Sequence, residues 1–145
     1  MKNKLKLYTK VIDRNVAGGV LIKCLNTDKV LLLLRSDIGD EPNTWSLVSG
    51  TIEPTERILD GIEREVKEEI NIDPNYITYK FKHKEVSRTK NLDFYYYEGY
   101  VGKEFKPTLN NEHLDYVWCD LNTLPQPLFP GTLNKIKNIL NDPKR

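Results

Sequence analysis

The sequence predicts an α/β fold, with α+β as the alternative, in which helices cover a β-sheet within a single domain spanning residues 1–145. Three observations predict it. Short apolar segments typical of strands are interspersed with two amphipathic helical segments. A length of 145 residues suits one domain. Hydrophobic residues make up 39% and charged residues 30% of the chain, as in ordinary globular proteins, and no linker or repeat divides it.

The elements follow one another in a regular order. The glycine pair Gly18-Gly19 within the first strand indicates a bulge or a close backbone approach. Prolines 125, 127 and 130 mark a loop before the last helix. The expected strands cover residues 16–25, 29–35, 45–48, 76–86, 91–101 and 116–119, and the expected helices cover residues 56–70 and 131–140.

The helix over residues 56–70 is the most clearly patterned element. Thr55 is a suitable N-cap, and Asn71 suits the left-handed conformation that ends many helices. Gly61 inside this helix costs about 1 kcal/mol relative to Ala, which indicates a close approach at that position. The apolar sector contains Ile58, Leu59, Ile62, Val66 and Ile70. The opposite, solvated side contains Asp60, Glu63, Arg64 and Lys67.

Three glutamates of this helix do not belong to its solvated side. Glu69 projects inside the apolar sector, Glu65 lies at its edge, and Glu68 lies just beyond. Glu65 and Glu69 form an i,i+4 pair of like charges, which destabilises an isolated helix. Carboxylates turned toward a core are costly unless a cation joins them. All-oxygen ligation without nearby His or Cys predicts Mg²⁺, with Mn²⁺ as the alternative. A solvated helix rich in glutamate is the competing interpretation.

A longer pattern supports the cation site. Gly50 is followed after five residues by Glu56, and after seven more by Arg64-Glu65-Val66-Lys67-Glu68-Glu69-Ile70-Asn71-Ile72. This spacing resembles the Nudix box of MutT-like hydrolases, with residues 50–72 matching every fixed position except one, where Asn71 replaces Gly. The preceding Trp45-Ser46-Leu47-Val48-Ser49-Gly50 also resembles the family pattern, with Val48 for Pro and Ser49 for Gly.

The resemblance implies a Nudix-type α/β/α sandwich with a mixed sheet and a loop-helix-loop catalytic motif. It implies metal binding by Glu65, Glu68 and Glu69. The backbone carbonyl of Ser49 is a further ligand if its dihedral angles permit. Glu112 lies six residues before Trp118, a spacing similar to that of an additional acidic ligand in some members.

Other roles follow with their alternatives. Either Glu69 or Glu112 is the general base, and Glu56 and Arg64 orient the ligands. Arg35 contacts a substrate phosphate or is a surface residue at a strand end, and Glu112 is equally consistent with a solvated loop acid. Asn134, after the proline loop, resembles the region that reads the base in some members. Tyr96 stacks on a base or, more simply, packs within the sheet. His83 and His113 are interpreted as surface or ordinary strand residues.

Together these features predict an Mg²⁺-dependent hydrolase in which water attacks phosphorus in a nucleoside diphosphate linked to a group X, foremost a nucleoside triphosphate. Nucleotide sugars, ADP-ribose and dinucleoside polyphosphates are alternative substrates, and a non-catalytic nucleotide-sensing module is the alternative function. A net charge of +1 and the absence of long apolar runs predict neither nucleic acid nor membrane as a partner. Isolated Cys24 and Cys119 suit a cytoplasmic protein, and a homodimer stays an alternative to a monomer.

Overall fold

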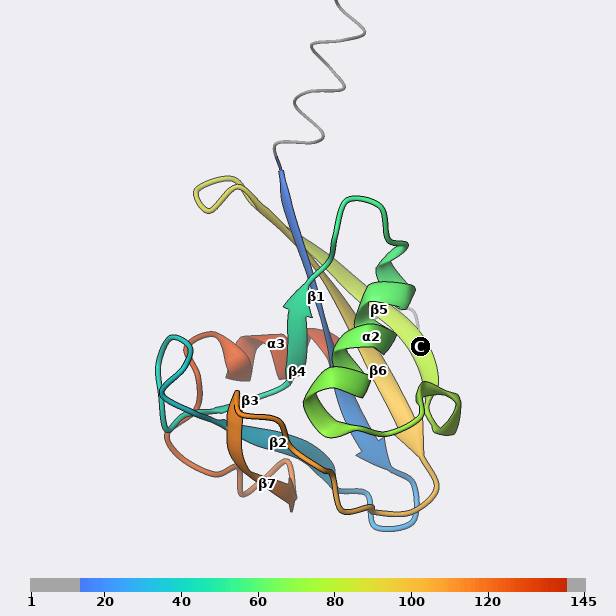
Figure 1. Cartoon of the computed structure of the whole chain (residues 1–145). Coiled ribbons are helices and arrows are strands. Elements are labelled where there is room, and N and C mark those ends of the chain that lie inside the picture. Colours follow the sequence, from blue (N-terminus) through green and yellow to red (C-terminus); the bar gives the residue numbers. More distant parts are fainter. Residues whose placement is uncertain (1–13, 141–145) are drawn as a thin grey trace, which may run out of the picture.

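A computed structural model describes residues 14–140 as a seven-stranded sheet between two α-helices (Figure 1). The elements are β1 (Asn15–Cys24), β2 (Val30–Arg35), β3 (Trp45–Ser46), β4 (Val48–Thr51), α2 (Ile58–Ile70), the 3₁₀ turn η1 (Pro74–Tyr76), β5 (Thr78–Ser87), β6 (Leu92–Val101), β7 (His113–Cys119) and α3 (Thr132–Leu140). The predicted segment 45–48 is thus two short strands, and β7 begins three residues earlier than predicted. The ends of the predicted domain, residues 1–13 and 141–145, lie outside the described residues.

The sheet is mixed, as the family resemblance implies. Its main path runs β3-β2-β1-β6-β5, with β4 paired to β1 and β7 paired to β2. β1 and β6 are parallel along their whole length, and the other pairs are antiparallel. On its other side β1 pairs with β4 near its start and with β2 at its end. β4 and β2 therefore occupy successive stretches of the same edge of β1.

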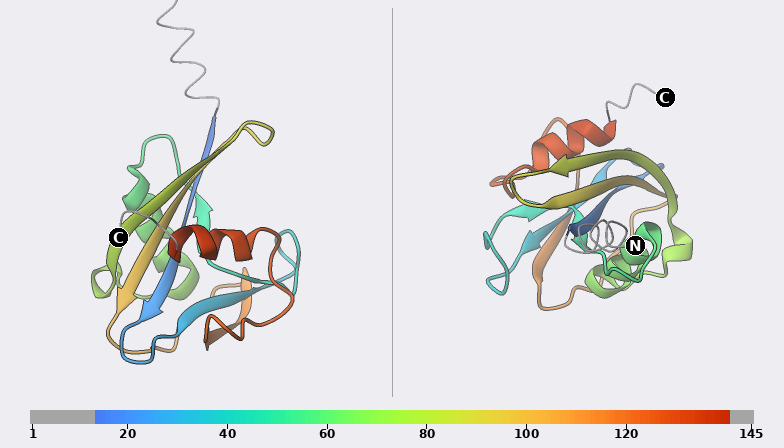
Figure 2. Two further views of the ribbon diagram at one scale, coloured as in Figure 1. Left: turned by 180° about the vertical axis from the view of Figure 1, so that it is seen from behind. Right: turned by 90° about the horizontal axis from the view of Figure 1, so that it is seen from above.

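Alternating side chains of the central strands build two cores, one on each face of the sheet. Val20 and Ile22 of β1 contact the cluster that includes Ile62 and Val66 of α2. Leu21, between them, belongs to the cluster beneath α3. Because a strand points successive side chains to opposite faces, one apolar strand supports both helices. Figure 2 shows α2 and α3 on opposite sides of the sheet, which confirms the α/β/α sandwich.

The helix α2 starts later than predicted. It begins at Ile58, after Arg57 in an extended conformation, and no side chain caps its N-terminus. The prediction of Thr55 as N-cap and Glu56 as a first-turn residue is therefore wrong. Glu56 lies in the loop before the helix, where its carboxylate accepts a hydrogen bond from the Glu53 N–H at 2.9 Å. At the other end, Asn71 has φ 51° and ψ 42°, so the predicted left-handed cap is confirmed.

Close packing accounts for two of the glycines that the sequence singled out. A β-carbon on Gly61 would lie 2.6 Å from Ile52 Cδ1, so the predicted close approach inside the helix is confirmed. A β-carbon on Gly18 would lie 2.9 Å from Ile62. The β1–β4 and β1–β6 ladders run through Gly18 and Gly19 in continuous register, so the pair marks close approach rather than a bulge. These contacts let α2 lie directly against β1 and β4.

Two further expectations concern membrane-spanning helices and the two cysteines. Neither helix within residues 14–140 has the length and apolarity needed to cross a membrane. Cys24 and Cys119 are both buried and free, as predicted.

Candidate active site

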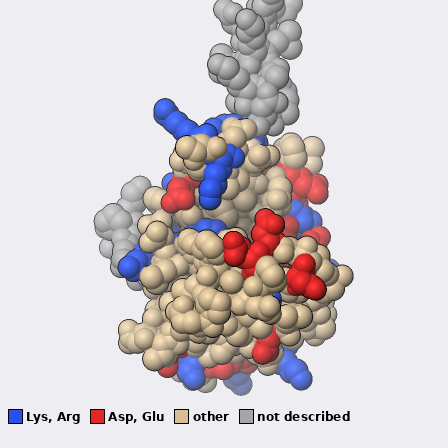
Figure 3. All heavy atoms as spheres, turned by 90° about the vertical axis from the view of Figure 1, so that its left-hand side faces the viewer, with Lys and Arg blue, Asp and Glu red and all other residues tan. Residues whose placement is uncertain are grey.

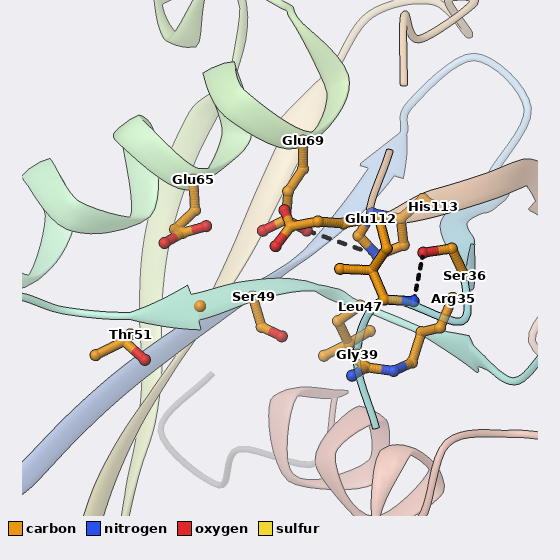
Figure 4. Close-up of a pocket in the computed structure, with 12 residues that line it drawn as sticks. Arg35, Ser36, Gly39, Leu47, Ser49, Thr51, Glu65, Glu69, Glu112 and His113 are labelled. Carbon is orange, nitrogen blue, oxygen red and sulfur yellow. Dashed lines mark hydrogen bonds and ion pairs between the residues drawn. The ribbon is translucent and has the colours of Figure 1, made fainter. Parts of the chain in front are cut away.

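A cavity of about 330 Å³ lies between α2, β4 and the segments next to β2 and β7 (Figure 4). Glu65 and Glu69 line it from α2. Glu112, the residue immediately before β7, also lines it. Ser49 and Arg35 line it as well. The topology brings these residues together because β2 pairs with β7 while β4 pairs with β1 beneath the helix.

Glu69 is the buried carboxylate of this cavity. Only 3% of the residue is exposed, so the prediction that it points into the apolar side of the helix is confirmed. Burial raises the pKa of Glu69 well above its ordinary value, and the neighbouring carboxylates of Glu65 and Glu112 raise it further. A backbone hydrogen bond from Ser49 acts in the opposite direction. The free energy of ionising Glu69 is therefore high unless positive charge is brought to the cavity.

Glu65 lies against the backbone of β4. A β-carbon on Gly50 would lie 2.2 Å from Glu65 Cδ, closer than any real contact permits. Gly50, the first residue of the box, has no side chain and therefore leaves space for the carboxylate of Glu65. Glu65 also accepts a hydrogen bond from Arg64 Nη1 at 3.0 Å, which holds the carboxylate beside the cavity.

Arg64 ties the box loop to the helix. Its Nε and Nη2 donate to the two carboxylate oxygens of Glu56 at 2.8 and 2.9 Å, and Nη2 also donates to the Thr51 carbonyl at 3.0 Å. These bonds lower the pKa of Glu56 to about 2. The assignment of Arg64 to the solvated side of the helix is therefore wrong, because the loop folds back over that side.

Glu68 differs from its two companions. Its side chain is 52% exposed and lies 3.3 Å from Arg64 Nη1, outside the cavity. Within residues 14–140, no three His, Cys, Asp or Glu side chains are arranged as a formed metal site. The structure thus places Glu65, Glu69, Glu112 and Ser49 of the predicted ligand set around one cavity, and leaves Glu68 at its outer edge.

Two residues of this region have no signal in the sequence. His113, interpreted as an ordinary residue, is buried, and its Nε2 lies 3.8 Å from Glu69 Oε1 (Figure 4). Burial lowers the pKa of His113 to about 4, so it is neutral near pH 7. Asn110 donates from Nδ2 to the Glu68 carbonyl at 2.9 Å and to Glu112 Oε2 at 3.2 Å. It thereby joins the end of α2 to the acid that precedes β7.

Residues 14–139 match the NUDIX domain family. The chain belongs to the Nudix family. Its sequence is 41% identical over 64 residues to dihydroneopterin triphosphate diphosphatase of Escherichia coli K12, which covers 44% of this chain and 41% of that relative, so less than half of the relative is matched. It is 31% identical over 109 residues to the CTP pyrophosphohydrolase of the same organism, covering 72% of this chain and 77% of that protein.

The fold of this Nudix domain also matches a solved structure. The MutT protein from Methanosarcina mazei Go1 superposes with a TM-score of 0.72 at 23% sequence identity, covering 91% of this chain and 96% of that one. The fold that the resemblance implied is therefore confirmed.

A second cavity of about 590 Å³ adjoins the first in this Nudix domain. Both are lined by Arg35, Ser49, Gly50 and Thr51, so the two cavities share a boundary along β4, and together they are called the groove. Arg35 stands at the junction: its Nε donates to the Asp40 carbonyl at 2.8 Å, and its guanidinium lies 4.4 Å from the Phe129 ring centroid.

The walls of the second cavity come from β6, the β5–β6 turn and α3. The predicted Asn134 is exposed on α3 and lines this cavity. Tyr96 also lines it but is only 1% exposed, and Phe94 packs beside it with ring centroids 4.6 Å apart. Most of the Tyr96 ring therefore packs within the sheet, in line with the simpler of its two interpretations. His83, the other histidine, is exposed and stacks on Tyr96.

Charge is unevenly distributed over the face of the molecule that Figure 3 shows. Figure 3 shows acidic side chains gathered at its middle, with basic side chains above them bordering a hollow. The first cavity is lined by the carboxylates of Glu65, Glu69 and Glu112, and the second by Lys90 and Lys135 together with Glu85.

Proposed function

We propose that this Nudix domain hydrolyses a phosphoanhydride bond of a nucleoside triphosphate or a similar heterocyclic triphosphate, with the help of a hard divalent cation. One observation carries the proposal: Glu65, Glu69 and Glu112 surround one cavity that adjoins a larger cavity with aromatic walls. The first suits the polyphosphate with its cations, and the second suits the ring.

The residues of the first cavity fit a divalent cation. Burial raises the pKa of Glu69, and the neighbouring carboxylates of Glu65 and Glu112 raise it further; a cation would offset both effects. The donors are all oxygen atoms, which favours Mg²⁺ and also admits Mn²⁺. Glu65, Glu69, Glu112 and the Ser49 carbonyl would hold the ion, and Glu68, whose side chain lies outside the cavity, is the remaining ligand that the family resemblance implies. When bound, such an ion neutralises phosphate charge and polarises phosphorus.

The protein groups have complementary tasks. We expect Glu69 to accept the proton of an attacking water, because burial raises its pKa and so makes its carboxylate a stronger base; Glu112, at the same cavity, is the alternative base. Arg64 and Glu56 hold Glu65 in place through charge-assisted hydrogen bonds. Arg35, at the junction of the two cavities, is positioned to bind a phosphate oxygen with the guanidinium donors that Asp40 does not use.

The names of the relatives support triphosphate substrates. One relative is a dihydroneopterin triphosphate diphosphatase and the other a CTP pyrophosphohydrolase. A non-catalytic sensing module, the alternative function, would not need a buried carboxylate cluster. Nucleotide sugars, ADP-ribose and dinucleoside polyphosphates are the alternative substrates.

Hydrolysis of a substrate panel tests the proposal. Nucleoside triphosphates, nucleotide sugars, ADP-ribose and dinucleoside polyphosphates are incubated with Mg²⁺ or Mn²⁺, and products are separated by chromatography. We expect a triphosphate to be cleaved fastest, with loss of turnover in excess EDTA and ¹⁸O from labelled water in one phosphate product. Full activity in EDTA, or a kcat/KM for ADP-ribose roughly tenfold above every triphosphate, would contradict the proposal.

A further inference from the structure

The second cavity carries a charged pair at its aromatic wall. Phe94 and Tyr96 of β6 line it, and Glu85 of β5 and Lys135 of α3 line it with them. A flat heterocycle suits such a cavity, and the polar groups that border the aromatic rings decide which heterocycle binds best.

Glu85 is directed toward this cavity by strand pairing. It lies opposite Phe94 in the antiparallel β5–β6 pair, so both side chains project from the α3 face of the sheet. The hydroxyl of Tyr96 donates to Glu85 Oε1 at 3.3 Å. This bond orients the carboxylate and occupies one of about four lone-pair positions. The second oxygen and the remaining lone pairs are available to a ligand.

Lys135 supplies the opposite charge. Its ammonium lies 4.2 Å from the Phe94 ring centroid and 5.8 Å from that of Phe129. The carboxylate of Glu85 attracts the Lys135 ammonium, and the nearby cations Lys90 and Arg35 repel it. The ring of Phe94 is therefore flanked by an acceptor-only group and a donor-only group.

We propose that Glu85 selects a ring that presents two adjacent N–H donors beside a carbonyl, which is the 2-amino-4-oxopyrimidine edge of guanine and of pterins. The two carboxylate oxygens accept the ring N–H and the exocyclic amino group together, and the Lys135 ammonium donates to the carbonyl. This inference rests on the proposed function, because it names the substrate class for the same groove.

The other common bases fit this arrangement less well. Cytosine offers one amino donor beside the acceptor N3, and adenine offers one amino donor beside the acceptor N1. Uracil places a carbonyl on each side of its single N–H. In each case an acceptor, either a ring nitrogen or a carbonyl oxygen, would face one oxygen of the Glu85 carboxylate, which has no proton to donate. Two-point pairing with the correct edge typically discriminates by roughly tenfold or more.

The substitution Glu85→Gln tests the assignment. A glutamine amide still accepts the Tyr96 hydroxyl bond but offers one acceptor and one donor, which matches cytosine better than guanine. Titration calorimetry in EDTA measures the binding of guanosine 5′-monophosphate and cytidine 5′-monophosphate, so binding is read without turnover. Glu104→Gln, an exposed carboxylate in the loop after β6, is the matched control.

The wild type and Glu104→Gln are expected to bind the guanine nucleotide roughly tenfold or more tightly than the cytosine nucleotide, and Glu85→Gln is expected to lose that ratio by a similar factor. The kcat/KM ratio for GTP over CTP with Mg²⁺ should change in parallel. A wild type without guanine preference, or a ratio unchanged in Glu85→Gln, would overturn the inference while triphosphate hydrolysis stands. A wild type that shows the binding preference but cleaves no triphosphate would overturn the proposed function alone.

Discussion

The carboxylate of Glu65 occupies the space that a side chain on Gly50 would need. A β-carbon there would lie 2.2 Å from Glu65 Cδ and 2.4 Å from its nearer oxygen. The spacing between the first glycine of the box and this glutamate is therefore a packing requirement between β4 and α2. It places one carboxylate directly against a backbone that also lines the cavity.

Gly50→Ala is expected to displace Glu65 and lower kcat by roughly 10- to 100-fold, the usual cost of disturbing groups that orient a metal site. The fold should persist, because the new methyl group meets the end of a flexible side chain. Gly102→Ala is the control, since a β-carbon there has no neighbour within 4 Å. Steady-state kinetics and thermal melts of both variants check this, and an unimpaired Gly50→Ala enzyme would refute the packing argument.

Glu69→Gln is expected to abolish turnover while leaving the metal-free protein at least as stable at pH 7. Gln removes the buried charge and its repulsion from Glu65 and Glu112. Mg²⁺ should raise the melting temperature of the wild type more than that of the variant, because ligand binding stabilises the folded state. Thermal melts with and without Mg²⁺, paired with single-turnover rates, measure both effects. A variant with a near wild-type rate would show that Glu69 has no catalytic role.

The same variant should change the pH dependence of stability. Burial raises the pKa of Glu69 above its ordinary value of 4.5, so the folded chain keeps a proton that the unfolded chain releases. This contribution is complete below about pH 4.5 and is lost as pH rises through the folded pKa. Denaturant unfolding of the metal-free proteins should therefore show a shallower decline with rising pH in Glu69→Gln. Parallel profiles would contradict the raised pKa.

His113 should act in the opposite direction. Burial lowers its pKa from 6.5 to about 4, so its contribution is present above pH 6.5 and is lost as pH falls toward 4. At about 1.4 kcal/mol per pKa unit, the loss is about 3 kcal/mol. His113→Gln should lack this acid-induced loss, whereas His83→Gln, at the exposed histidine, should retain it. Unfolding free energies between pH 4 and 7 test the difference.

Asn110→Ala should reduce activity without unfolding the protein. The change removes the side-chain bonds to the Glu68 carbonyl and to Glu112, so the acid loses its tether to α2. We expect kcat to fall by roughly tenfold, the lower range for groups that orient functional side chains. Asn111→Ala is the neighbouring control, because within residues 14–140 the side chain of Asn111 makes no hydrogen bond and its backbone carbonyl accepts one from the Ser36 hydroxyl. Equal activity of the two variants would argue against a positioning role.

Sequence periodicity was sufficient for the helix and for the direction of Glu69, because the angle of a residue around a helix follows from its number. It failed for Arg64 and for the start of α2, because periodicity does not describe how the loop before a helix folds. Periodicity puts Arg64 on the solvated side of the helix, yet Glu56 and the Thr51 carbonyl accept its hydrogen bonds. His113 and Asn110 carry no spacing pattern. The pairing of β7 with β2 and the hydrogen bond from the Thr108 N–H to the Ile70 carbonyl at 3.2 Å bring their segment to the end of α2.

The residues proposed for hydrolysis and those proposed for binding the ring come from different parts of the chain. The carboxylates of the first cavity belong to α2 and to the residue before β7. The side chains of the second cavity, Glu85 among them, belong mainly to β5, β6, α3 and the loop at Phe129. Arg35 and a few β4 residues are the shared boundary. New substrate preferences can therefore be engineered, or can arise by drift, through substitutions on the aromatic side alone. A library restricted to those positions would explore specificity with the hydrolytic chemistry held constant.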